Sequence, residues 1–403
     1  MRIRADHVFD GTSWTGPADI TVIDDRITEV APVGDSVVDH HVAAVTPGLI
    51  DVGVSASGYA EVPSSTDPYA PERAYARMSL RYGVTTLVDV NNSPAPLSYL
   101  GSLADAGDGP TIIASYGRLT TAPSGRHDHM VDSETASSVV DALVIAGARL
   151  ISVGAVNEMV LDVILQSAER HGIPVVVARQ TQPGTPGLML VRRPADLAVA
   201  LGRAALLVDE DVYFLPQLHA TQCWPVDGLL DAPDAHLATP VLPHCRNFLR
   251  SRGRIGKRIG RTIVGRYYGD REPGLLDPEA DQRATVAAGA GRCIASSAGG
   301  ETGVVPGLSI WHELERLEQS LDPEVAFACA TSIPTRALGL ADVGVVRPGA
   351  RADLLLLDTA QPSTAARLRD GLRAVVVQGR VLDARGLEEE VEDLVTSSLR
   401  EQG

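Results

Sequence analysis

The sequence predicts an α/β protein, a (β/α)8 TIM barrel accompanied by a small β-sandwich that is formed by the N- and C-terminal segments. Two observations lead to this fold class. In the middle of the chain, short apolar runs alternate with segments of helical period, which is the order found in parallel barrels. At both ends, apolar and polar residues alternate between tight turns, which is typical of antiparallel strands. The composition, 44% hydrophobic and 21% charged, allows a full core.

The β-sandwich is expected from both ends of the chain. Apolar residues in 1–46 recur in short runs that are broken by Gly11, Gly16 and the Asp24–Asp25 pair. The segment from residue 340 onward has the same pattern, with a turn at Pro348–Gly349. Because the termini of a domain often lie close together, we predict that 1–46 and 340–403 form one composite domain and that 47–339 form the barrel.

The barrel is predicted from alternating strands and helices in 47–339. The predicted strands are Leu49–Val54, Thr85–Val90, Thr111–Ala114, Leu150–Val153, Pro174–Ala178, Ala205–Val208, Tyr213–Leu215 and Cys293–Ala295. The predicted helices are Pro71–Tyr82, Glu134–Ala146, Val156–His171, Pro194–Leu201, Asp281–Ala288 and Trp311–Leu321. In such a barrel, functional residues gather at the carboxyl ends of the strands and in the loops that follow them, so these loops are searched for a site.

Charge and composition narrow the function classes. The net charge of −16 argues against a free-standing nucleic-acid or anionic-membrane binder. The sequence contains no run of about 18 apolar residues, so a membrane span is not expected. Residues 1–20 lack the apolar core of a signal peptide, and we expect a soluble, cytoplasmic protein. The four cysteines form no CxxC pair and suggest neither a zinc knuckle nor a disulfide framework.

Three segments resemble the amidohydrolase superfamily. TPGLIDVGVSASG at 46–58 resembles its first barrel strand, YGVTTLVDVNN at 82–92 its second, and ATSIPTRALGLADVGVVRPGARADLLLLD at 330–358 its closing helix and return into the sandwich. SIWHELERL at 309–317 is similar to the matching helix of imidazolonepropionase- and prolidase-like members. The resemblance implies hydrolysis of C–N or related bonds by one or two divalent metals, which activate water and polarise the scissile carbonyl.

The sequence departs from the family pattern at the metal ligands. The family places HxH after strand one, a carboxylated Lys or a Glu after strand four, His after strands five and six, and Asp after strand eight. The aligned residues here are Gly53 and Ser55, then Ser152, Ala178 (Arg179 with a shift of one), Val208 and Ala298. Lys257, the only lysine, lies far from strand four. We therefore predict a degenerate member that lacks the metal ligands and has no cofactor, because these residues offer few donor atoms for zinc.

Polar residues nevertheless follow several predicted strands. We predict catalytic roles for Tyr116, His127, His129 and His219, and substrate binding by Arg179, Asn92, Arg126 and Ser297. In the His127–Asp128–His129 sequence, alternation along a strand places both imidazoles on one face, and a nearby carboxylate could orient one of them. Tyr116 and Arg179 together would supply an acid and a fixed cation. The alternative is that the histidines belong to a solvated loop and that Arg179 pairs with an acidic neighbour.

Three functions are left open. The favoured hypothesis is a metal-independent enzyme that performs a cyclisation, isomerisation, elimination or transfer on a small, possibly anionic metabolite by His/Tyr acid–base chemistry. The second is a non-catalytic pseudoenzyme that acts as a scaffold or activator of a partner protein. The third is a metal-dependent C–N hydrolase with unusual ligands.

A basic segment suggests a partner. Arg246–Arg266 contains no acidic residue and eight basic ones: Arg246, Arg250, Arg252, Arg254, Lys257, Arg258, Arg261 and Arg266. It is interpreted either as a solvated insertion or as a site for an acidic protein or another anionic group. Few aromatic residues accompany it, so nucleic acid is not expected. A homodimer is a further expectation.

Overall fold

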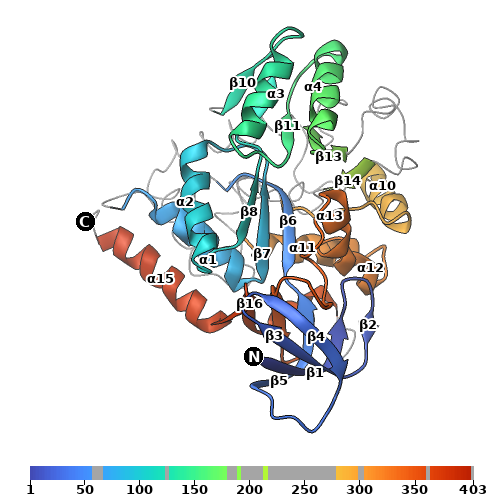
Figure 1. The fold of residues 1–403 in the computed structure, drawn as a ribbon, viewed down its shortest axis with the longest axis vertical. Coiled ribbons are helices and arrows are strands. Elements are labelled where there is room, and N and C mark those ends of the chain that lie inside the picture. Colours follow the sequence, from blue (N-terminus) through green and yellow to red (C-terminus); the bar gives the residue numbers. More distant parts are fainter. Residues whose placement is uncertain are drawn as a thin grey trace.

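The computed structural model describes residues 1–56, 67–122, 127–178, 188–191, 212–216, 278–297, 304–359 and 364–400. A β-rich domain lies at one end of the molecule (Figure 1). Three strands, β6 (Leu49–Val54), β7 (Val84–Asp89) and β8 (Thr111–Ala114), continue from it towards the other end, where the helices α3 (Ala136–Ile145) and α4 (Glu158–Arg170) lie. Both ends of the chain contribute strands to the β-rich domain, as the alternating patterns predict.

The β-rich domain is built on one hydrogen-bonded sheet of eight strands, ordered β17-β16-β15-β5-β1-β3-β4 with β2 beside β1. Its strands are β1 (Arg2–Phe9), β2 (Trp14–Thr15), β3 (Ala18–Ile23), β4 (Arg26–Pro32), β5 (His40–Pro47), β15 (Leu354–Leu357), β16 (Leu372–Val377) and β17 (Arg380–Asp383). The N- and C-terminal segments meet where β5 pairs antiparallel with β15. The sheet folds back on itself, because Arg26 at the start of β4 bridges Arg351, which precedes β15. Alternate apolar residues such as Ile3, Ile20 and Leu354 fill the space inside.

The barrel strands form two further sheets in the described residues. β6 (Leu49–Val54), β7 (Val84–Asp89) and β8 (Thr111–Ala114) are parallel neighbours. The second sheet has the order β10-β9-β11-β12-β13-β14. Its strands are β9 (Arg118–Thr120), β10 (Asp128–Met130), β11 (Ile151–Val153), β12 (Val175–Ala178), β13 (Leu188–Val191) and β14 (Val212–Leu215). An isolated parallel β-bridge joins Phe214 of β14 to Cys293, which lies in the segment predicted as the last barrel strand.

Two details of the barrel differ from the prediction. The third strand continues beyond Ala114, because β8 and β9 are separated only by residues 115–117, where Tyr116 has a positive φ of 58°. This break moves the chain from pairing with β7 to pairing with β11. Between β12 and β14 lies β13, which is antiparallel to both and was not predicted. The strand predicted at Ala205–Val208 and the helix predicted at Pro194–Leu201 lie outside the described residues.

Most of the predicted helices are present with shifted ends. They are α1 (Ala70–Arg81), α3 (Ala136–Ile145), α4 (Glu158–Arg170), α10 (Pro278–Gly289) and α11 (Leu308–Leu317). The prediction omitted α2 (Pro94–Asp105), although Ser93 followed by Pro94 is a typical helix start. It also omitted α12 (Pro323–Ala328), α13 (Ser332–Ala337), α14 (Ala365–Asp370) and α15 (Ala384–Arg400). No helix in the described ranges is long and apolar enough to cross a membrane.

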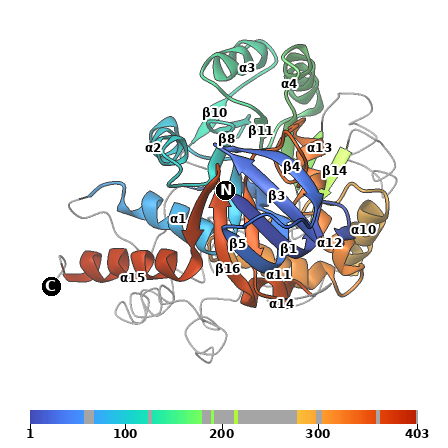
Figure 2. The same ribbon diagram turned by 60° about the horizontal axis from the view of Figure 1, so that its bottom comes forward.

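The C-terminal helix α15 packs on the barrel helix α1 and runs outward to the C-terminus (Figure 2). Leu387 and Val391 belong to the same buried cluster as residues of α1. Two ion pairs flank this contact, Arg77 Nε to Glu390 at 2.9 Å and Arg81 Nη2 to Glu388 at 3.1 Å. The domain limits at 46/47 and 339/340 remain a prediction, but this part of segment 340–403 lies against the barrel as well as against β16 and β17.

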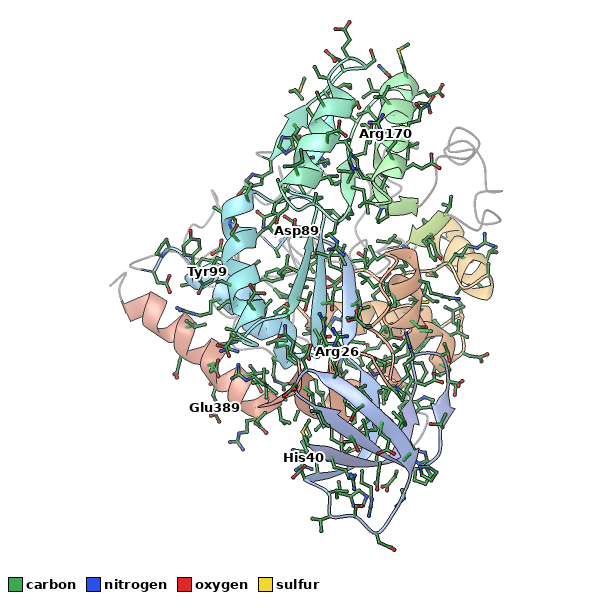
Figure 3. All side chains as sticks on the ribbon, in the orientation of Figure 1. Arg26, His40, Asp89, Tyr99, Arg170 and Glu389 are labelled. Atoms are coloured by element: carbon green, nitrogen blue, oxygen red, sulfur yellow. The ribbon has the colours of Figure 1, made fainter. Side chains whose placement is uncertain are left out.

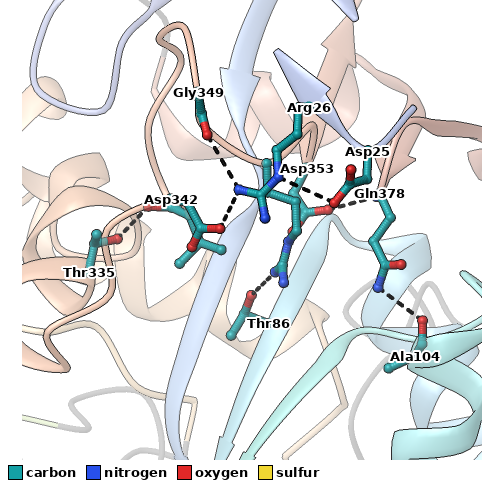
Figure 4. A network of polar contacts seen from close by, with 11 residues as sticks. Asp25, Arg26, Thr86, Ala104, Thr335, Asp342, Gly349, Asp353 and Gln378 are labelled. Atoms are coloured by element: carbon teal, nitrogen blue, oxygen red, sulfur yellow. Dashed lines mark hydrogen bonds and ion pairs between the residues drawn. The ribbon is translucent and has the colours of Figure 1, made fainter. Parts of the chain in front are cut away.

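A polar network joins the closed end of the barrel to the β-rich domain (Figure 4). Arg351 Nε donates to Asp353 Oδ2 at 2.5 Å, and Arg351 Nη2 reaches Thr86 Oγ1 on β7 at 3.4 Å. The backbone amide of Gln378 donates to Asp353 Oδ1 at 2.8 Å, while its side chain donates to the Ala104 carbonyl at the end of α2. Arg26 and Asp342 form a further ion pair beside it. These contacts occupy the end of the barrel opposite its mouth.

Candidate functional site

Two buried aspartates lie on the neighbouring strands β6 and β7, whose carboxyl ends border the predicted mouth of the barrel. Asp51 lies on β6. Asp89, which is labelled in Figure 3, is the last residue of β7. Asp51 accepts hydrogen bonds from the Ser297 backbone amide at 2.9 Å and from Ser297 Oγ at 2.5 Å. Asp89 accepts one from the Ala56 amide at 2.7 Å and one from the Asn91 amide at 3.1 Å. The two carboxyls therefore hold the chain segments that follow β6, β7 and the last barrel strand.

Burial makes the ionised form of both carboxyls costly. Loss of hydration raises the pKa of Asp89 to about 7, although the amides of Ala56 and Asn91 oppose the shift. The same cause raises the pKa of Asp51 to about 6 against the two hydrogen bonds from Ser297. Tyr75 of α1 is buried close enough to both aspartates for their charges to add to the rise in its own pKa, which comes chiefly from burial. Asp89 consequently changes protonation near neutral pH.

Two of the predicted substrate-binding residues lie beside these carboxyls. Ser297 is fully buried, and its hydroxyl is engaged by Asp51. Asn92 is also fully buried, and its Oδ1 accepts from the Ser93 amide at 2.9 Å. The Asn92 side chain is near enough to Asp89 to favour the ionised form of the Asp89 carboxyl, but Asn92 Nδ2 makes no hydrogen bond of regular geometry with a described residue. The structure thus brings Asn92 together with Asp89, and Ser297 together with Asp51.

The predicted histidine pair is oriented differently from the expectation. β10 pairs with β9 so that Asp128 lies beside Arg118 and His129 lies beside Leu119. Leu119 belongs to the cluster formed with α3 and α4, so His129 shares the helix-covered face and Asp128 shares the interior face. His129 Nε2 contacts the Tyr116 carbonyl at 2.8 Å. This register places His129 on the helix-covered face, and His127 precedes Asp128 on the same side of the pleat as His129. The catalytic roles of both histidines stay predictions.

Tyr116 is likewise part of the packing on the helix side. Its ring packs against the cluster that contains Leu119 and Leu143. Its hydroxyl is among the atoms nearest to Gly147, at the end of the α3 turn. The Tyr116 ring therefore lies in the layer between the strands and the helices, and its catalytic role stays a prediction. The break at 115–117 is the physical reason, because a residue with positive φ redirects the following strand.

The remaining predicted residues lie outside the described part of the chain. These are the catalytic candidate His219, the substrate-binding candidates Arg126 and Arg179, and the basic segment Arg246–Arg266. Their roles stay predictions.

The family metal centre can be tested at the ligand positions that the structure describes. Gly53 supplies no donor atom and has a φ of 87°, at a register shift between β6 and β7. Ser55 Oγ donates to the Asn91 carbonyl at 3.1 Å. Ser152 offers a hydroxyl alone. Within the described residues there is no cluster of three His, Cys, Asp or Glu side chains arranged to hold a metal. At these three positions the only side-chain donors are the hydroxyls of Ser55 and Ser152, which are poor ligands for zinc, and the loss of the family's metal ligands stays a prediction.

Asp51 and Asp89 were not selected from the sequence. Each lies inside an apolar run whose every residue is buried in its strand, LIDVGV and VTTLVD. A charged residue in such a run is seldom fully buried without a specific partner. An aspartate inside a strand that is otherwise expected to be buried is therefore the sequence feature that could have identified both residues. Both aspartates lie within the strands, so the rule that functional residues follow the strand ends does not identify them.

The comparisons with known proteins agree with this architecture. The model of the Amidohydrolase family matches residues 291–382. Among solved structures, a Xaa-Pro dipeptidase with bound methionine is 16% identical over 95% of this chain and 99% of its own, with a TM-score of 0.64. Molinate hydrolase is 16% identical over 96% of this chain and 95% of its own, with a TM-score of 0.64.

A. niger ochratoxinase is 16% identical over 96% of this chain and 96% of its own, with a TM-score of 0.61. The search of curated protein sequences gave no match. At these identities the structural likeness establishes the fold alone. Together with the match over 291–382, it confirms the predicted resemblance: the chain has the (β/α)8-barrel and β-domain fold of the amidohydrolase superfamily.

Proposed function

We propose that this protein is an enzyme that acts on a small metabolite by acid–base chemistry at the barrel mouth, without the metal centre of the amidohydrolase family. The observation that supports it is the pair Asp51 and Asp89, which two adjacent strands bury at the position where the fold places its chemistry. Buried carboxyls without a cation among the described residues are costly for stability, and such groups concentrate at functional sites.

Asp89 is the proposed acid–base group. Its pKa of about 7 lets it take up and release a proton near neutral pH, which is the condition for efficient general acid–base catalysis. Such a group contributes roughly 10²–10⁴-fold to a rate. That suits an isomerisation, elimination, cyclisation or transfer better than the hydrolysis of an unactivated amide. Asp51 and Ser297 hold the neighbouring segment in place.

The test compares full-length wild-type protein with Asp89→Asn and a control, Asp19→Asn, which alters a buried carboxylate in the β-rich domain. Each protein is incubated with a cellular metabolite extract in the presence of EDTA, and consumption is followed by liquid chromatography and mass spectrometry. We expect one metabolite to be converted by wild type and by Asp19→Asn, and at least about 10²-fold more slowly by Asp89→Asn. The wild-type rate should change with pH around 7.

A second candidate function is a non-catalytic scaffold. It is favoured by the hydrogen bonds of Asp89 to the amides of Ala56 and Asn91, since holding two loops requires no chemistry. No conversion of any metabolite, with or without added divalent metal, would overturn the proposed enzyme and leave this function. Conversion that requires added zinc or manganese would also overturn it, in favour of a metal-dependent hydrolase with unusual ligands.

A further inference from the structure

We propose that Asn92 is a positioning residue for Asp89, and that its side-chain amide becomes the third hydrogen-bond donor to the Asp89 carboxylate when that group is ionised. This inference rests on the proposed function, because it concerns the same acid–base group. Asp89 ends β7, and Asn92 directly precedes Ser93, the residue before the first turn of α2. Asn92 therefore links the carboxyl to the start of that helix.

The orientation of the Asn92 amide is fixed by its contact with the helix start. Asn92 Oδ1 accepts a hydrogen bond from the Ser93 backbone amide at 2.9 Å. A flipped side chain would place Nδ2 against this N–H group, so that two donors would face each other. Nδ2 therefore points away from Ser93. It is the only donor on this side chain, so it is the atom that acts on Asp89.

This Nδ2 group is buried without a regular partner. Asn92 is 0% exposed, and Nδ2 makes no hydrogen bond of regular geometry with a described residue. A buried N–H group in this condition costs free energy, and such groups are uncommon in folded proteins. Nδ2 lies near Asp89 but outside regular hydrogen-bond geometry. A donor that is used only in the second protonation state of its neighbour would have this arrangement.

Ionisation of Asp89 creates the acceptor that Nδ2 lacks. The two carboxyl oxygens already accept one backbone amide each, from Ala56 at 2.7 Å and from Asn91 at 3.1 Å. A protonated carboxyl has one oxygen occupied by the proton, whereas a carboxylate accepts through both oxygens and can hold further donors. Hydrogen bonds to a charged acceptor are also about twice as strong as neutral ones. Loss of the proton therefore strengthens the attraction of the carboxylate for Nδ2.

The other titratable groups around Asp89 do not provide such a donor. β7 packs against β6, β8 and α1. Tyr75 of α1 interacts with the charges of both Asp89 and Asp51 of β6, and β8 contains no titratable residue. Glu72 of α1 interacts instead with Asp67, and the arginines of α1 pair with Asp67 or with α15. All these groups stay unchanged when Asn92 is substituted, so a change in Asp89 protonation then reports on Asn92.

The test follows the protonation of Asp89 itself, without a substrate. Full-length wild type and variants are labelled isotopically at the side-chain carboxyl carbon of aspartate, and NMR records the carboxyl resonances from about pH 5 to about pH 9. The Asp89 resonance is the one that is missing in Asp89→Asn. We expect its midpoint at about pH 7 in wild type. Asn92→Leu should raise the proton affinity of Asp89 at least about threefold, because the ionised form loses a donor.

The matched control is Asn91→Leu. It removes the neighbouring side-chain amide but keeps the backbone N–H that Asp89 accepts. We expect the proton affinity of Asp89 in this variant to stay within about threefold of wild type. A rise of less than about threefold in Asn92→Leu, or an equal rise in Asn91→Leu, would overturn the inference.

Asn92→Asp is a second variant, which keeps the shape of the side chain and an acceptor for the Ser93 amide. It replaces the Nδ2 donor by an oxygen, so the proton affinity of Asp89 should again rise at least about threefold while near-ultraviolet circular dichroism stays that of wild type. An unchanged or lower proton affinity in Asn92→Asp would also overturn the inference.

These outcomes are separable from the proposed function. An unchanged midpoint in Asn92→Leu, in a protein whose metabolite conversion depends on Asp89, would overturn this inference and leave the enzyme. A shifted midpoint in a protein that converts no metabolite would support the inference and overturn the enzyme. Where both proposals hold, the pH dependence of conversion should shift in Asn92→Leu by the same amount as the Asp89 midpoint, which a purely structural role would not produce.

Discussion

At the closed end of the barrel, Asp353 is buried beside Arg351 (Figure 4). On β6 and β7, by contrast, Asp51 and Asp89 are buried among hydroxyl and amide donors. Burial raises the pKa of all three carboxyls, and Arg351 opposes the rise at Asp353. A charge paired in this way serves to join the barrel to the β-rich domain. Asp51 and Asp89 have no cationic partner among the described residues, and their carboxyls gain or lose a proton near neutral pH. A purely structural contact does not require such a pKa.

The largest effect is expected from breaking the pair at the closed end. Arg351→Ala leaves the Asp353 carboxylate buried with the Gln378 amide as its one hydrogen-bond donor in the described part of the chain, and it removes the contact with Thr86. We expect the free energy of unfolding to fall by about 3–5 kcal/mol, because an uncompensated buried charge remains. Denaturation by urea measures this. Arg373→Ala is the control, since its exposed ion pair with Asp358 should contribute less than about 1 kcal/mol.

The second prediction concerns pH and the mouth. The folded-state pKa of Asp89 lies above its ordinary value of 3.8, so the folded state binds the proton more tightly than the unfolded state. Its contribution to stability is present at low pH and is lost as pH rises through about 7. Between pH 5 and pH 8 we expect wild type to lose about 2 kcal/mol more stability than Asp89→Asn. Identical pH profiles of unfolding for the two proteins would contradict the distinction between the two ends.

The third prediction tests the donors that replace a cation at the mouth. Ser297→Ala removes the Oγ–H donor to Asp51 and leaves the Ser297 backbone amide as the donor that remains among the residues the structure describes. We expect a loss of about 1–3 kcal/mol, together with a further rise in the pKa of Asp51. The thermal transition at several pH values measures both. Ser102→Ala, on the exposed side of α2, should cost less than about 0.5 kcal/mol, and an equal loss in both variants would contradict the role of Ser297.

The smallest effect is expected at the histidines. His129→Ala removes a partly buried contact with the Tyr116 carbonyl on the helix side of β10, and should cost about 1 kcal/mol or less. Because this imidazole does not face the interior, metabolite conversion should change by less than about threefold, against at least about 10²-fold for Asp89→Asn. A hundredfold loss in His129→Ala would show that the original histidine hypothesis describes the mouth better than the aspartates do.

The site was only partly predictable from the sequence. Asn92 and Ser297 were identified because they follow apolar runs at the carboxyl ends of strands, and they do lie beside Asp89 and Asp51. The sequence also indicated that His127 and His129 share a face, but not which face. The face depends on the pairing of β10 with β9, whose partner residues are ten positions apart in the sequence and meet only in the folded chain.

The sequence by itself determined the elements whose pattern is local. Alternation and apolar runs predicted the strands at 49–54 and 111–114, and they indicated that both ends of the chain supply the β-rich sheet. Only the tertiary structure decided how Asp51, Asp89 and Asp353 differ. Their surroundings come from segments far apart in the sequence, such as Ser297 beside Asp51, and the pKa of a carboxyl depends on the charges and water that those segments bring or exclude.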